Sequence, residues 1–213
     1  MRTITLICIF SFASAVPAIF GQVAPTVKGT SDSTMEWGTI KDGKFVSTRL
    51  GLTLPIPAHF SVLSSVESEM LADSGSDLMK EGIVSEKQFD AAIARTIRLL
   101  AITEKPVGSP ENSALEVVTV KQQKGITANM ALAANVALLK GSPYVLKRSL
   151  TPLKLGTHTF SGAELEGTFG EVKVTQRMYV IMHKGYSIVF ASVYLNDKQR
   201  TEMEKILSAV LLK

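Results

Sequence analysis

Apolar residues recur with three different spacings along this chain, and each spacing predicts a different kind of element. The chain opens with an almost unbroken apolar run from Ile4 to Phe12. Between residues 36 and 60, short apolar stretches alternate with turn residues such as Asp42-Gly43, which favours β-hairpins because glycine adopts positive φ without strain. Helical spacing follows in the middle of the chain, and long alternating stretches fill the last third. The pattern predicts a targeting segment followed by a domain of helices and strands.

The first half of the domain is expected to contain short strands and three helices. A hairpin joins 36–40 to 44–48, and a third strand over 52–56 stops at Pro55 and Pro57, because proline has no N–H for a sheet ladder. The remaining expected elements are a helix over 63–80, a second helix that begins at a capping box of Ser85 and Gln88, a strand pair over 96–103 and 115–120, and a helix capped by Thr127 that ends near Leu139.

The last third is expected to be β structure closed by one helix. Pro152 is expected to separate the first two strands. Asn196 is expected to cap the final helix. The strands are expected over 144–150, 153–160, 163–168, 172–183 and 186–195, and the apolar face of the final helix is expected to comprise Met203, Ile206, Leu207, Val210 and Leu211.

The stretch 186–195 predicts how the layers are arranged, because both of its faces carry apolar side chains. A strand with one solvated face would alternate apolar and polar residues more sharply. We therefore expect an α/β (α+β) fold in which an antiparallel β-sheet is sandwiched between α-helices, as a single domain over residues 35–213. The two faces comprise Tyr186, Ile188, Phe190 and Tyr194 on one side, and Ser187, Val189, Ala191 and Val193 on the other.

The N-terminal 21 residues have the three parts of a secretory signal peptide. Arg2 precedes the apolar run, and small residues follow it, with cleavage expected after Ala15, Ala18 or Gly21. Residues 22–34 are small and polar and predict a flexible tether. The expected location is therefore secreted or periplasmic, and the mature chain is expected to have no transmembrane helix.

Removal of this segment would also remove Cys8, the one cysteine in the chain. The exported domain would then have no disulfide, no thiol nucleophile and no thiolate metal site. The net charge of +4 and the pI of about 9.1 would suit an anionic partner. However, lysines and arginines are scattered among 19 acidic residues without any run of like charge, so a mixed solvated surface and no nucleic-acid partner are expected.

Three segments of the chain resemble PsbP-like domains. The stretch from Lys44 to Pro57 is similar to their opening hairpin, with a Leu-Gly-Leu element before a proline, and the stretch from Leu155 to Phe160 is similar to a short glycine-containing strand. The stretch from Tyr179 to Phe190, with a Lys-Gly-Tyr turn between two long strands, is similar to their closing hairpin. His59 and Phe60 stand where such domains often have a tryptophan. The resemblance implies an antiparallel sheet between helices, and it implies binding without any shared chemistry.

No catalytic or cofactor motif is present in the sequence. There is no nucleophile elbow, phosphate loop, dinucleotide fingerprint or paired-histidine helix, so no catalytic residue and no cofactor are expected. The candidates for a metal site are His158, Glu164, Glu166 and His183, because side chains at alternate positions of a strand share one side. Glu164 and Glu166 are also the best-spaced carboxylate pair for acid–base chemistry, and a charged strand edge is the alternative.

These observations favour an exported, non-catalytic binding or accessory module whose partner is an envelope or extracellular protein. One alternative is a small apolar ligand or lipid held between helix and sheet, and another is a hydrolase without a recognisable motif. The candidate ligand-binding residues are Met130, Leu138, Tyr186, Phe190 and Tyr194.

The signal peptide can be tested by intact-mass spectrometry of the protein recovered from its cells. We expect a mature N-terminus at Val16, Ile19 or Gln22, because small residues precede each of these positions. A protein that retains Met1 and the apolar run would contradict this prediction.

Overall fold

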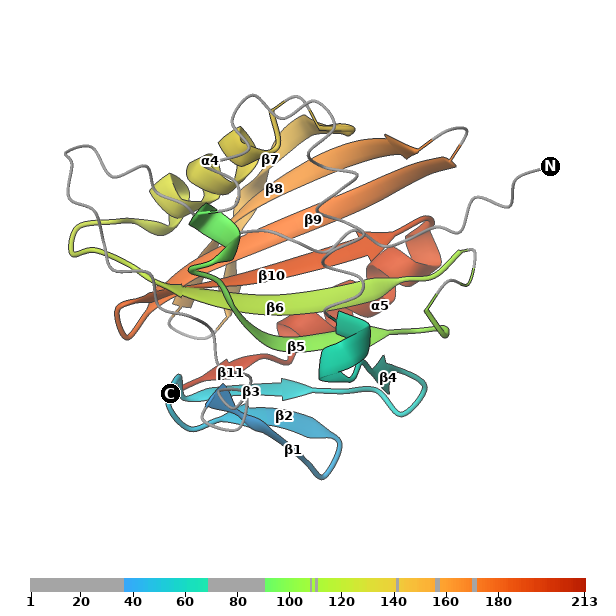
Figure 1. Ribbon diagram of the computed structural model, residues 1–213, viewed down its shortest axis with the longest axis horizontal. Helices are drawn as coiled ribbons and strands as arrows, with labels where there is room; N and C mark the ends of the chain where they lie inside the picture. The colour runs from blue at the N-terminus through green and yellow to red at the C-terminus, as the bar shows by residue number, and fades with distance from the viewer. Residues whose placement is uncertain are drawn as a thin grey trace.

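Two antiparallel β-sheets and the helices packed on them make up the fold (Figure 1). The computed structural model describes residues 37–68, 91–107, 109, 111–140, 142–155, 158–169 and 172–213. The signal peptide and tether expected over residues 1–34, and most of the two helices expected between 63 and 94, lie outside these ranges.

The larger sheet has seven strands in the order β4-β5-β6-β10-β9-β8-β7. All of its neighbouring strands are antiparallel. The strands are β4 (Ser61–Val62), β5 (Ile97–Thr103), β6 (Ala114–Lys121), β7 (Tyr144–Leu155), β8 (His158–Phe169), β9 (Val172–His183) and β10 (Tyr186–Tyr194).

The smaller sheet has four strands in the order β1-β2-β3-β11, so the C-terminal strand pairs with an early one. Asp42 and Gly43 both have positive φ in the turn between β1 and β2, as the Asp-Gly pair predicts. The strands are β1 (Thr39–Lys41), β2 (Lys44–Ser47), β3 (Leu52–Pro55) and β11 (Leu211–Leu212).

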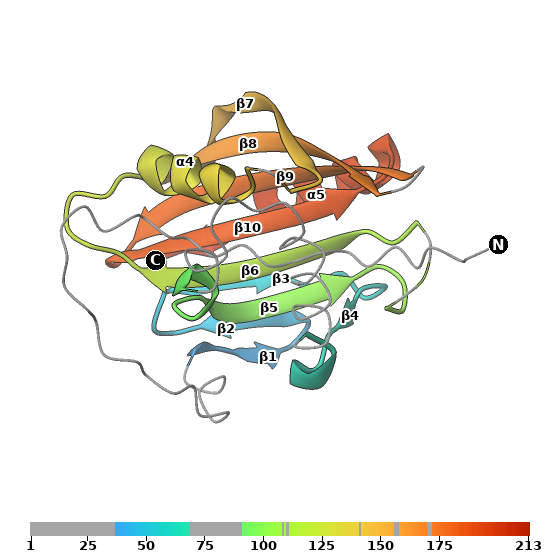
Figure 2. The same cartoon turned by 45° about the horizontal axis from the view of Figure 1, so that its top comes forward.

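Two helices lie on opposite faces of the larger sheet, α4 (Ala128–Leu138) and α5 (Asp197–Ser208). Each begins at the expected cap, because the side chains of Thr127 and Asn196 accept hydrogen bonds from backbone N–H groups of the first turn. In Figure 1, α4 lies in front of the strands and α5 behind them, and Figure 2 shows the same layers from a view turned by 45°.

The predicted two-sided burial of 186–195 is confirmed in β10. Val189, Ala191 and Val193 belong to the core under α4, whereas Ile188 and Phe190 belong to the core that contains α5 and the smaller sheet. The expected fold class, an antiparallel sheet between helices, is therefore observed. The smaller sheet is an addition that the hydrophobic pattern did not predict, and it covers one face of the larger sheet together with α5.

The strand boundaries expected around Pro152 are wrong. Residues 144–155 form one strand and residues 158–169 form the next, so the chain does not break at the proline. A shift of register between Leu150 and Leu153 accommodates Pro152. The strand tolerates the proline because β7 lies at the edge of the sheet, where an absent N–H need not interrupt pairing with a second neighbour.

The apolar face expected for the final helix also needs one correction. Met203, Ile206, Leu207 and Val210 are buried, but Leu211 is exposed and lies in β11. The helix ends at Ser208, and the chain then runs antiparallel to β3, where Leu211 pairs with Thr53. This pairing removes Leu211 from the buried stripe that helical spacing predicts for it.

Gly51 is expected to be the least replaceable glycine of the small sheet. Its φ is +62°, and a Cβ there would collide with the backbone carbonyl of Lys213. Gly43 has a similar φ of +67° but only one ordinary contact, at 3.8 Å. We expect Gly43→Ala to cost about 1 kcal/mol for the left-handed backbone alone, and Gly51→Ala to cost about 3 kcal/mol because β11 must also move. Urea unfolding measures both, and equal losses would show that the C-terminal strand does not depend on this close approach.

Candidate functional site

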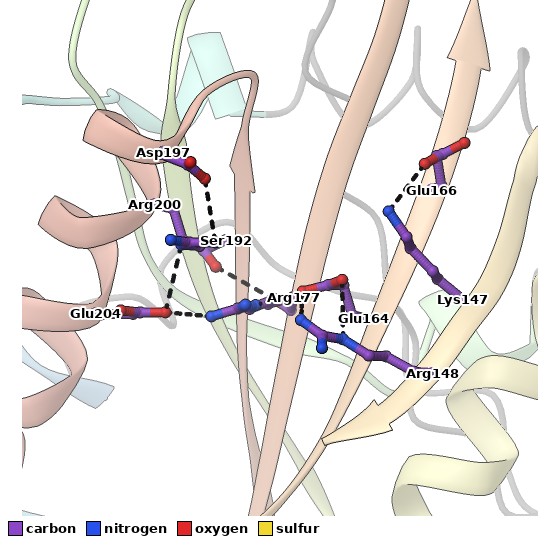
Figure 3. A network of polar contacts seen from close by, with 9 residues as sticks. All are labelled: Lys147, Arg148, Glu164, Glu166, Arg177, Ser192, Asp197, Arg200 and Glu204. Atoms are coloured by element: carbon purple, nitrogen blue, oxygen red, sulfur yellow. Dashed lines mark hydrogen bonds and ion pairs between the residues drawn. The ribbon is translucent and has the colours of Figure 1, made fainter. Parts of the chain in front are cut away.

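The most extensive polar cluster in the described residues joins β7, β8, β9 and α5 (Figure 3). Glu164 accepts two hydrogen bonds from Arg148, each 3.1 Å long, and one of 2.8 Å from Arg177. Arg177 also pairs with Glu204 on α5, and Arg200 lies 3.1 Å from Asp197 on the same helix. The cluster therefore ties α5 to the middle of the sheet.

Glu164 is held in its ionised form by this arrangement. Its side chain is only 6% exposed. Burial by itself would raise the pKa of Glu164, but hydrogen bonds and charge from Arg148 and Arg177 outweigh it and lower the pKa. A carboxylate with a lowered pKa and both oxygens occupied is a poor proton donor at neutral pH. The cluster is suited to holding the layers together and not to acid–base chemistry.

Glu166 does not share a site with Glu164. It pairs with Lys147 at 3.2 Å, and both side chains are substantially exposed. Both carboxylates project from the α5 side of β8, but each is paired separately with a basic residue of β7. The separate pairs do not form a catalytic site, and the alternative of a charged strand edge is also wrong, because β8 lies between β7 and β9.

The two histidines among the metal candidates do come together, away from the two glutamates. The rings of His158 and His183 are edge to face with centroids 5.3 Å apart, and His183 Nε2 lies 3.2 Å from the backbone oxygen of Lys213. Glu164 is six residues from His158 along an extended strand, about 20 Å away. In the described part of the chain, no three His, Cys, Asp or Glu side chains are grouped to hold a metal ion.

The surroundings of the histidine pair are positively charged. Burial lowers the pKa of His183, although a hydrogen bond to Lys213 partly opposes the shift, and the neighbouring His158 and Lys184 lower it further. A divalent cation would meet this same positive potential. The geometry therefore supports a neutral His183 at pH 7 and gives a cation little attraction.

An aromatic stack lies beside the histidines. The guanidinium of Arg49 sits 4.0 Å from the centre of the Trp37 ring and donates to the hydroxyl of Tyr186 at 3.3 Å. Trp37 and Tyr186 also meet edge to face at 5.5 Å. The stack joins the smaller sheet to the β9–β10 hairpin, and it covers the tryptophan ring.

The candidate ligand-binding residues lie on opposite sides of the larger sheet. Met130 and Leu138 project from α4, whereas Tyr186 and Phe190 belong to the core on the other face. Tyr194 lies at the far end of that second face, near Arg177, and burial raises its pKa to about 12. Because the sheet separates the two groups, these residues cannot line one pocket between helix and sheet.

Two buried polar groups on the α4 face were not anticipated from the sequence. Glu116 pairs with Arg98, and burial raises the pKa of Glu116 although the arginine opposes the shift. Gln176 is fully buried, and neither end of its amide has a hydrogen-bond partner among the described residues. Both interrupt otherwise apolar alternation along their strands, which is the signal that could have identified them.

Comparison with solved structures shows a PsbP-like fold. The solution structure of cyanobacterial PsbP (CyanoP) from Synechocystis matches 88% of this chain and 99% of its own, with a TM-score of 0.51 and 8% identity. At that identity the likeness shows the fold alone.

Two further solved structures match with TM-scores below 0.5. LpqN of Mycobacterium tuberculosis, described as involved in cell envelope biogenesis, matches 76% of this chain and 83% of its own, with a TM-score of 0.46 and 14% identity. A Pseudomonas aeruginosa protein of unknown function matches 55% of this chain and 81% of its own, with a TM-score of 0.42 and 8% identity. No family model matches the chain, and no curated protein sequence is significantly similar to it.

The structural role of Glu164 can be separated from that of Glu166 by the same substitution. Glu164→Gln leaves Arg177 buried with a weakened set of partners, so we expect a loss of about 3 kcal/mol in the free energy of unfolding. Glu166→Gln removes an exposed pair, and we expect a loss below about 0.5 kcal/mol.

The pH dependence checks the cause of this difference. Because the folded-state pKa of Glu164 is lowered, its stabilisation is present at neutral pH and is lost as the pH falls below the ordinary value of 4.5. Urea unfolding of both variants across this range should show the Glu164→Gln deficit shrinking in acid. A deficit independent of pH would mean that packing, and not charge, holds this residue.

Proposed function

We propose that this chain is an exported, non-catalytic binding module of the cell envelope that holds an extended segment of a partner protein along β7. The observation that carries the proposal is the edge that this strand forms among the described residues. β7 is 12 residues long, and of the strands that the structure describes it pairs only with β8. The edge of a sheet presents unpaired N–H and C=O groups that a further strand can join.

Side chains of β7 support docking over its first half. Val145 is 68% exposed and Leu146 is 46% exposed, and successive residues of a strand point to opposite faces. A partner strand would therefore meet an apolar side chain on each face. The other three sheet edges among the described strands, β1, β4 and β11, are each two or three residues long and offer much less pairing.

The charge of β7 indicates the chemistry of the partner segment. The strand contains no acidic residue, and two of its basic residues, Lys147 and Arg148, are paired with Glu166 and Glu164 of β8. The third, Lys154, has no ion-pair partner among the described residues. Pairing between two copies of β7 would bring these basic residues together, which is unfavourable for directly opposed like charges. A partner segment that combines apolar and acidic residues fits this edge better than a second copy does.

The other functions considered have less support from the geometry. The residues expected to line an apolar ligand pocket lie on opposite faces of the larger sheet, so they do not form one pocket. The best-spaced carboxylates are each neutralised by a basic neighbour. Export rests on the charged, apolar and small-residue order of the first 21 residues.

Site-specific photo-crosslinking in the native cells tests this function. A photoreactive residue at Val145 is compared with one at Val66, which is 63% exposed but does not lie on a sheet edge. We expect one discrete protein adduct from position 145 and none from position 66. Leu146→Asp in the first protein should weaken that adduct about five-fold, because the added charge opposes an acidic segment.

Two outcomes would contradict the proposal. Equal adducts from both positions would show that contact does not depend on β7. An adduct that consists of two crosslinked copies of this chain would show that β7 mediates self-association and does not bind a partner protein.

A further inference from the structure

Five basic side chains from separate parts of the chain are gathered at one end of the molecule. They are Arg49, Lys121, Lys124, Lys184 and Lys213, all exposed, and we refer to them as the basic end. In Figures 1 and 2, the C-terminus, the β9–β10 turn and the end of β6 lie together at this end.

Backbone hydrogen bonds hold these segments in place. The N–H of Gln122 donates to the carbonyl of Gly185 at 2.9 Å, which joins the end of β6 to the β9–β10 turn. The N–H of Lys213 donates to the carbonyl of Gly51 at 3.0 Å, which joins the C-terminal strand to the β2–β3 turn. Lys184 Nζ lies 2.9 Å from the place that a Cβ at Gly51 would occupy, so the two pairs of segments are themselves neighbours.

No acidic residue offsets this charge within the same segments. Residues 48–51, 119–127, 182–187 and 209–213 contain neither aspartate nor glutamate. In the part of the chain that the structure describes, the four lysines have no ion-pair partner. The four lysines alone equal the net charge of +4 of the whole chain, so the other charged side chains of the sequence sum to zero.

An exposed apolar residue accompanies the lysines. Leu211 is 58% exposed and lies two residues before Lys213, on a strand whose neighbour β3 begins directly after Gly51. Basic residues around an exposed leucine match a bilayer surface that carries anionic headgroups above an apolar interior.

The aromatic residues at this end disfavour a single-stranded nucleic acid. Stacking of bases needs an open ring face. Trp37 is buried beneath the guanidinium of Arg49 and against Tyr186, so its ring is not available. The exposed groups are ammonium ions and one leucine, which suit phosphate headgroups at a lipid surface.

From this arrangement we propose that the basic end docks on the surface of a membrane that contains anionic phospholipids. The docking involves no inserted helix, and in the described residues no helix is long and apolar enough to cross a bilayer. It is independent of β7, so either surface can fail its test without affecting the other.

Sedimentation with lipid vesicles tests the proposal, using the protein in the form recovered from its cells. One set of vesicles contains phosphatidylcholine alone, and the other contains equal amounts of phosphatidylcholine and phosphatidylglycerol. The test variant combines Lys121→Gln, Lys124→Gln, Lys213→Gln and Lys184→Asn, because Lys184 has a positive φ that asparagine tolerates. The matched control combines Lys41→Gln, Lys44→Gln, Lys140→Gln and Lys198→Gln, which are exposed lysines elsewhere on the surface.

Both variants lose four positive charges and keep the same N-terminus, so their difference reports the position of the charges. Each basic residue near an anionic bilayer strengthens binding about five-fold, so the test variant should lose at least about 100-fold in partition coefficient. The control should lose only a few-fold. Binding by the unaltered protein should weaken as salt rises, because screening shortens the reach of the charges. Circular dichroism and a thermal melt establish that both variants are folded.

A second variant distinguishes a lipid surface from any other polyanion. Leu211→Ser should weaken binding to the anionic vesicles several-fold and leave binding to polyuridylate and polyglutamate unchanged, since only the bilayer offers an apolar layer. Equal losses in the test and control variants would overturn the proposal. So would tighter binding to polyuridylate or polyglutamate than to the vesicles, or no binding to phosphatidylglycerol at all.

Discussion

The fold depends on a strand that must be buried on both faces. β10 has apolar side chains on both sides, and all but its first residue are buried. Each fully buried Val, Ile or Phe side chain stabilises the fold by about 1.5–3 kcal/mol, so leaving either face in water would cost much of the stability of a domain this size. One face is covered by α4, and the other needs both α5 and a second sheet. The layered architecture follows from this requirement.

The same layering determines where polar chemistry can occur. One network of ion pairs joins the larger sheet to α5, where Arg177 links Glu164 and Glu204. The positive and negative charges of this network nearly balance, and its charged groups are hydrogen-bonded to one another. Such a network is suited to holding α5 on the sheet. At the periphery, the described structure leaves backbone groups along the outer side of β7 unpaired and gathers lysines at the basic end. Both proposed contact surfaces therefore lie where the two-sided core leaves the backbone or the charges uncovered.

In proteins with a PsbP-like fold, the residues at both proposed surfaces can differ from one protein to another. The fold is shared with cyanobacterial PsbP at 8% identity, so it is maintained by the arrangement of apolar layers and not by a common set of polar residues. Turns, strand edges and the ends of the sheet can vary without disturbing the two cores, and binding surfaces of related folds commonly differ at such positions.

Most local elements can be predicted from the sequence. The β1–β2 and β9–β10 turns, the caps Thr127 and Asn196, and the two-sided burial of β10 follow from short-range rules about glycine, cap hydrogen bonds and alternation. The same rules failed at Pro152 and Leu211, because edge position and pairing with β3 are decided by residues far away in the chain.

Which charges act together depends on the folded chain. Along the sequence the basic residues are scattered, and they predict an ordinary mixed surface. Folding brings Lys121, Lys184 and Lys213 to one end, where the described residues supply no acidic side chain to pair with them. It also neutralises Glu164 and Glu166 and separates them from the histidines. Electrostatic potential depends on distances in space, and those distances follow from strand pairing across the whole chain.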